Sequence, residues 1–138
     1  MGDPTPLVEH LGLRHVALNV SDVERAVVFY RDLLGFRVVW APDPQNIYLT
    51  SGCDNLAIHL ADEIRRPGAL DHIGILVRLA DDVSQAETAL RKAGVTILAA
   101  TKVHRDQSVS CYVADPDGNS LQILFEPGIS KLVLAEEN

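Results

Sequence analysis

The sequence predicts an α+β protein built from two tandem βαβββ modules. A strand-like run with a histidine near its start occurs twice, over 13–20 and 70–77. Each copy is followed by a helix-like segment that ends at a glycine, and each glycine is followed by three further strand-like runs. An internal repeat of this size indicates the fold more strongly than any single motif does.

The two histidine-bearing strands define a candidate site. Side chains alternate between the faces of a strand, so His15 and His72 each point away from a face that is purely branched aliphatic. That aliphatic face is the one that a helix should cover; it consists of Val16, Leu18 and Val20 in the first copy and Ile73, Ile75 and Val77 in the second. The repeat therefore predicts a site with two histidines.

The helices and remaining strands follow from periodicity and from start and stop signals. Ser21 and Glu24 have the spacing of a capping box, and apolar residues at helical spacing predict a helix over 21–34 that Gly35 ends. The same reasoning predicts a second helix over 82–93, before Gly94. The other strands are predicted over 36–41, 45–50, 55–60, 95–101, 107–114 and 119–125.

The chain is expected to form one domain overall, because neither module is large enough to bury a sheet face alone. An irregular N-terminal arm covers 1–12, and the first module covers 13–61. A charged linker over 62–69, broken by Pro67-Gly68, leads to the second module over 70–126. The C-terminal tail, 127–138, is apolar enough to form a short docked helix.

Composition excludes several classes of function. The net charge of −7 argues against nucleic-acid binding, which needs clustered Lys and Arg. No apolar run reaches membrane-spanning length, and the N-terminus lacks the pattern of a secretory signal. With only Cys53 and Cys111, a disulfide framework is not expected, and both residues read as reduced thiols of a cytoplasmic protein.

The repeat, the run Phe29–Phe36 and the turn sequence Asp115–Asn119 resemble the vicinal oxygen chelate superfamily. That superfamily includes glyoxalase I, extradiol dioxygenases, and fosfomycin- and bleomycin-resistance proteins. The resemblance implies curved half-barrel sheets around a cleft, with the helices outside. It also implies a homodimer with shared clefts and an isologous interface.

The resemblance further implies a divalent metal held from the first and last strands of the modules. His15 and His72 match the first-strand ligands, and His59 lies on the last strand of the first module. Gln122 stands where the family commonly has a glutamate, and it has neither the charge nor the proton-accepting ability of that residue. The predicted metal set is His15, His59, His72 and Gln122, and the ion is Zn, Ni, Fe(II), Co or Mn.

The function implied is that of a divalent-metal-dependent enzyme of lyase, isomerase or dioxygenase type, acting on a small oxygen-bearing metabolite. The alternative is a metal-free protein that binds or sequesters a small molecule, as the bleomycin-resistance relatives do. Catalytic residues are not assigned. The substrate-binding residues predicted on strands that border the cleft are Tyr112, Ser110, Tyr48 and Asn19. With 5% aromatic residues, the sequence offers no obvious platform for a large stacked ligand.

Overall fold

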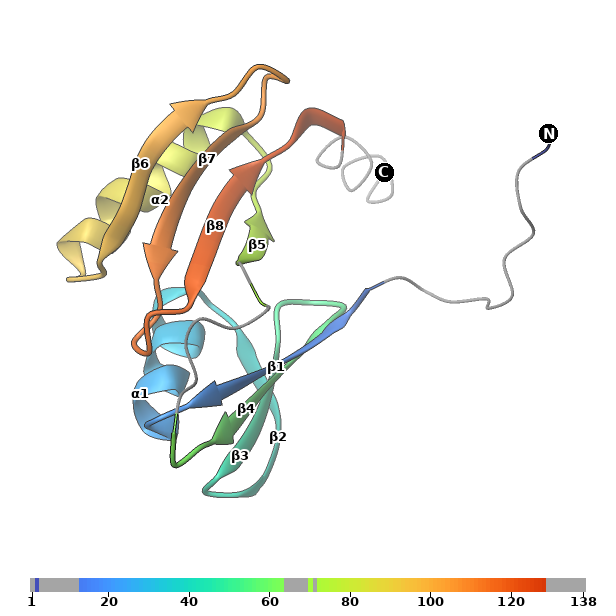
Figure 1. Ribbon diagram of the computed structural model, residues 1–138, viewed down its shortest axis with the longest axis vertical. Helices are drawn as coiled ribbons and strands as arrows, with labels where there is room; N and C mark the ends of the chain where they lie inside the picture. The colour runs from blue at the N-terminus through green and yellow to red at the C-terminus, as the bar shows by residue number, and fades with distance from the viewer. Residues whose placement is uncertain (1, 3–12, 64–69, 71, 129–138) are drawn as a thin grey trace. The chain divides into compact units, whose positions relative to one another are not determined.

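The computed structural model describes residues 2, 13–63, 70 and 72–128 (Figure 1). The chain divides into two compact units, Met1–Asp62 (unit 1) and Glu63–Asn138 (unit 2). The division falls at the start of the linker predicted over 62–69. Most of that linker, the predicted N-terminal arm and the predicted tail helix lie outside the described residues.

Unit 1 is a βαβββ module with one helical segment and a four-stranded sheet (Figure 1). The strand order is β1-β4-β3-β2, with β1 parallel to β4 and the other pairs antiparallel. Its elements are β1 (His15–Val20), α1 (Val23–Val27), the π-helical segment η1 (Val28–Leu33), β2 (Arg37–Asp43), β3 (Asn46–Thr50) and β4 (Asn55–Leu60).

Unit 2 repeats the same topology, with strand order β5-β8-β7-β6. The predicted tandem of two βαβββ modules is confirmed. Within the described residues no helix is long and apolar enough to span a membrane. The elements of unit 2 are β5 (Ile73–Leu76), α2 (Ala80–Lys92), β6 (Ile97–Val103), β7 (Val109–Ala114) and β8 (Ser120–Phe125).

The predicted alternation of the strands holds in both sheets. In unit 1, Leu18 and Val20 of β1 are buried, while His15, Ala17 and Asn19 between them are exposed. In unit 2 the residues buried on one face of β7 and β8 include Cys111, Val113, Leu121 and Ile123. One face of each sheet therefore forms core, and the other presents the side chains of interest.

The first helix differs from the prediction in its cap and its period. Asp22, not Ser21, is the N-cap, and its Oδ1 accepts from the backbone N–H of Arg25 at 3.0 Å. From Val28 the helix widens into π geometry, whose hydrogen bonds span five residues instead of four. The wider turn brings Phe29 and Tyr30 to the core together and leaves Leu33 41% exposed.

The turn before β8 has the predicted chemistry. Asp115 is buried, and its Oδ1 accepts from the backbone N–H groups of Asp117 at 3.0 Å and Asn119 at 2.7 Å. Gly118 has φ +82°, which glycine adopts without strain. These bonds fix where β8 begins and so which face Gln122 occupies.

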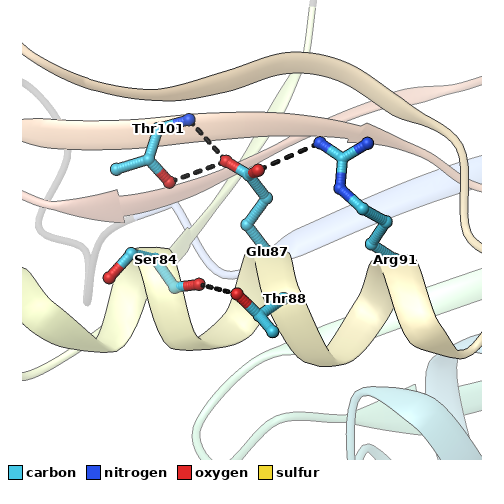
Figure 2. A network of polar contacts seen from close by, with 5 residues as sticks. All are labelled: Ser84, Glu87, Thr88, Arg91 and Thr101. Atoms are coloured by element: carbon cyan, nitrogen blue, oxygen red, sulfur yellow. Dashed lines mark hydrogen bonds and ion pairs between the residues drawn. The ribbon is translucent and has the colours of Figure 1, made fainter.

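A network of hydrogen bonds joins α2 to β6 (Figure 2). The β6–β7 pairing shifts between Ala99 and Lys102, the irregularity expected of a β-bulge. Within that bulge the backbone N–H and hydroxyl of Thr101 donate to Glu87 Oε1 at 2.6 and 2.9 Å, and Arg91 donates to Oε2 at 3.0 Å. The two bonds from Thr101 are partly buried, since the side chain of Glu87 is 17% exposed, whereas the bond from Arg91 is exposed to solvent.

We expect Glu87→Ala to lower the free energy of unfolding by about 1–3 kcal/mol, because the N–H of Thr101 loses a charged acceptor. Hydrogen bonds from Thr101, above all the one from its backbone N–H, hold the pKa of Glu87 below its usual value. Their stabilisation is present above the usual glutamate pKa and is lost as pH falls through the lowered one. Urea unfolding should therefore show a gap between wild type and variant that shrinks in acid. Gln85→Ala, at an exposed position of α2, is the control; equal effects of the two changes would contradict the stabilising role of this network.

Candidate functional site

Gln122 is half-buried on β8, on the face of the unit 2 sheet opposite to the core residues Leu121 and Ile123. In the sheet it pairs with Gly74 of β5 on one side and Tyr112 of β7 on the other. A Cβ atom built on Gly74 would meet Gln122 Oε1 at 3.9 Å, so the amide oxygen lies over the glycine. The missing side chain at position 74 leaves this oxygen directed toward β5.

His72 and Tyr112 complete a cluster with Gln122. The rings of His72 and Tyr112 meet edge to face, with centroids 5.3 Å apart and planes at 90°. His72 precedes Ile73, which pairs with Leu121, so His72 and Gln122 stand two positions apart on neighbouring strands. That register corresponds to roughly 8 Å between Cα atoms, from which two side chains can converge on one ion.

His15 is held in a defined tautomer in unit 1. Its Nδ1 lies 2.9 Å from Oδ1 of Asn55, the residue that pairs with it on β4. A carbonyl oxygen only accepts, so in the neutral imidazole this contact puts the proton on Nδ1 and the lone pair on Nε2. This arrangement prepares an imidazole for metal ligation, because the second nitrogen fixes ring and tautomer.

His59 does not occupy the place that the sequence predicted for it. Ala17 pairs with Ala57, as Gly74 pairs with Gln122, so the repeat-equivalent of Gln122 is Ala57. His59 pairs with Asn19, four positions beyond the His15–Asn55 pair. Four residues of strand are roughly 13 Å, whereas two nitrogens on one zinc-like ion lie within about 4 Å of each other. By this register His15 and His59 of one chain lie too far apart to share an ion, which argues against His59 in a ligand set with His15.

The remaining predicted site residues have different environments. Ser110 is buried, and its Oγ lies 2.9 Å from Nε2 of His104. Asn19 is exposed on β1, and Tyr48 is half-buried on β3. The structure therefore places Asn19 and Tyr48 on the His15 face of unit 1, and Ser110 and Tyr112 on the Gln122 face of unit 2.

Sequence reasoning missed the asparagines that orient the histidines. Asn55 bonds His15, and Oδ1 of Asn46 lies 2.6 Å from Nδ1 of His59. Their signal is weak, since each is a single polar residue at the first position of its strand, and only the register places it opposite a histidine.

No three His, Cys, Asp or Glu side chains gather as a metal-holding group within the described ranges. Gln122, Asn46 and Asn55 carry amide side chains, so they do not count toward such a group. Both cysteines are free: Cys53 is exposed with Arg14 Nη1 2.9 Å from its sulfur, and Cys111 is buried, which raises its pKa.

Comparison with known proteins identifies similar chains. The family model described as "Glyoxalase/Bleomycin resistance protein/Dioxygenase superfamily" matches residues 12–123. Glutathione transferase FosA of Serratia marcescens is 34% identical over 80% of this chain and 78% of its own. A trivalent organoarsenical cleaving enzyme of Bacillus sp. (strain MD1) is 28% identical over 80% of this chain and 71% of its own. A glyoxalase-related enzyme from Fulvimarina pelagi superposes with a TM-score of 0.73 at 25% identity, over 86% of this chain and 90% of that one.

Proposed function

Because the chain belongs to the Glyoxalase/Bleomycin resistance protein/Dioxygenase superfamily, we propose that it is a divalent-metal-dependent enzyme acting on a small oxygen-bearing metabolite. The observation that carries the proposal is the pair of repeat-equivalent histidines, His15 at the start of β1 and His72 immediately before β5. The similar proteins named above as a transferase and a cleaving enzyme support an enzymatic role.

We assign the ligands to His15, His72 and Gln122, and leave out His59 because of its register. Nε2 of His15 carries a lone pair, and Oε1 of Gln122 is directed toward the strand that His72 precedes. Two neutral imidazoles and an amide oxygen suit Zn, Ni, Fe(II), Co or Mn. His15 is contributed by the same chain as the other two ligands or by a second copy in a dimer.

The residues favour some reaction classes over others. A bound ion would supply Lewis acidity to a substrate oxygen. Gln122 cannot accept a proton, so an isomerisation that needs a base at this position is disfavoured. The carboxylate of a two-histidine, one-carboxylate iron site is also missing. A transfer or addition to an electrophile whose oxygen is polarised needs neither group, and the naming of one similar protein as a glutathione transferase supports this class.

A metal-free binding protein is the second candidate. Gln122 favours it, because the amide replaces an anionic ligand and leaves only neutral donors in the assigned set. Calorimetric titration of chelator-treated protein with the five ions separates the two candidates. Saturable binding of one ion per chain supports the enzyme, and no binding of any of the five supports the metal-free protein.

The protein is expected to be a homodimer. Superfamily members commonly pair, and unit 2 exposes large apolar side chains that a second copy could cover: Leu79 is 62%, Leu98 52% and Val103 63% exposed. Sedimentation equilibrium at micromolar concentration should give twice the chain mass of 15.0 kDa. A monomer under those conditions would contradict this expectation.

A further inference from the structure

A row of four side chains crosses the unit 1 sheet on the face that also carries His15 and Asn19. Trp40 pairs with Tyr48, Tyr48 with Ala57, and Ala57 with Ala17, so the row runs from β2 through β3 and β4 to β1. The first two positions hold large rings and the last two hold methyl groups. Ala57 is buried and Ala17 is exposed, so the open floor of the row lies at Ala17.

The two rings are stacked. The centroids of Trp40 and Tyr48 are 4.9 Å apart with planes inclined at 28°, and Trp40 is 59% exposed. A stacked aromatic pair beside positions without large side chains is a place where a third ring can pack. The low aromatic content predicted no such platform, but the strand register brings two of the few aromatic residues together.

A chain of polar contacts fixes His59 next to this row. The side-chain N–H groups of Asn46 donate to Asp43 Oδ1 at 3.0 Å and Oδ2 at 3.1 Å, and the Oδ1 of Asn46 accepts from Nδ1 of His59 at 2.6 Å. The ring of His59 meets Tyr48 edge to face, with centroids 5.8 Å apart. In the neutral ring of His59, Nδ1 therefore carries the proton and Nε2 is a hydrogen-bond acceptor, for which the described residues supply no donor.

His15 and His59 flank the row on opposite sides. His15 lies two positions before Ala17 on β1, and His59 lies two positions after Ala57 on β4. Each is thus roughly 7 Å along the strands from the alanine nearest to it. A flat molecule lying over Ala17 beside Tyr48 would therefore lie between the two histidines.

We propose that this face of unit 1 is the subsite for a flat aromatic ring that carries a hydrogen-bond donor. The ring lies over Ala17 against the Trp40–Tyr48 stack, and its donor, a phenolic O–H or a ring N–H, donates to Nε2 of His59. The end of the ligand near His15 carries the oxygen that a bound metal ion would polarise. The inference names a substrate class for the proposed enzyme and rests on that function, but ring binding itself needs neither metal nor turnover.

Three probes of similar size test the subsite in full-length, chelator-treated protein: 2-naphthol, 2-methoxynaphthalene and decahydro-2-naphthol. Calorimetry is done at about pH 7, where the phenolic O–H keeps its proton. 2-Naphthol should bind about 2- to 12-fold more tightly than the methyl ether, which cannot donate, and more tightly than the saturated alcohol by a similar factor, because that probe cannot stack. Trp40 is the only tryptophan, so its emission should change with 2-naphthol and not with the saturated alcohol.

Three variants locate the binding. Trp40→Leu should weaken 2-naphthol about 2- to 12-fold, and Ala17→Leu should weaken it about fivefold or more by filling the floor. Both positions are exposed, so the variants should fold. His59→Phe keeps a ring beside Tyr48 but removes the acceptor, so it should abolish the preference for 2-naphthol over its methyl ether. Val28→Ala, at an exposed apolar residue of η1, is the control and should bind like wild type.

Equal affinity for 2-naphthol and decahydro-2-naphthol, or an unchanged preference in His59→Phe, would overturn the inference. The outcome is separable from that of the proposed function. Ring binding without metal binding would leave the subsite standing and remove the enzyme. Metal binding without ring binding would do the reverse.

Discussion

Replacing His15 by alanine is expected to weaken metal binding by more than about 100-fold. The reason is that a ligand is lost, and even loss of a hydrogen-bond partner behind a ligand costs roughly 10- to 100-fold. His72→Ala should have the same effect, because the two histidines hold equivalent places in the two modules. Asn55→Ala should weaken metal binding only by roughly 10- to 100-fold, because it removes the hydrogen bond that fixes the tautomer of His15 but leaves the ligand in place. Competition titration with a chromophoric chelator measures each affinity.

His59→Ala is the matched control for these variants. It removes the same chemical group from the same sheet face, but the register places it four positions from His15. It should therefore leave metal affinity within about twofold of wild type. That change is smaller than the roughly 10- to 100-fold loss expected when a hydrogen-bond partner behind a ligand is removed. A large loss of affinity in His59→Ala, together with little change in His15→Ala, would contradict the ligand assignment.

Gln122→Glu is expected to tighten metal binding at least about tenfold, because ligand charge raises the affinity of a site for a divalent ion. Native activity should stay unchanged or fall, since the neutral amide is the native ligand in this account.

Gln85→Glu makes the same charge change at an exposed position of α2 and should not alter metal affinity. If Gln122→Glu also left affinity unaltered in a protein that binds metal, Gln122 would lie outside the coordination sphere. The ligand set would then reduce to the two histidines and water.

The repeat made the fold predictable from the sequence. Strand alternation assigned Leu18 and Val20 to the core and His15 to the other face, and the structure agrees because a period of two leaves little freedom of register between faces. The first helix was less predictable. Phe29 entered the core through a π-helical segment, and the helical period used for the prediction contains no such widening.

The faces of single strands were more predictable than the register between strands. The repeat placed His15 and His72 at equivalent positions, and Gln122 entered the candidate set through the family resemblance. The position of His59 depended on the register between β1 and β4, which the sequence does not encode locally. The Trp40–Tyr48 stack was missed for the same reason, since bulges in β2 shift its pairing with β3.

The proposed metal site is tested most directly by the metal content of protein purified without a histidine tag, after incubation with Zn, Ni, Co, Mn or Fe(II) and removal of excess ion. We expect close to one ion per chain for at least one of these metals in wild type, and close to none in His15→Ala and His72→Ala. A content near zero in wild type for all five metals, in protein shown to be folded, would contradict the proposed site.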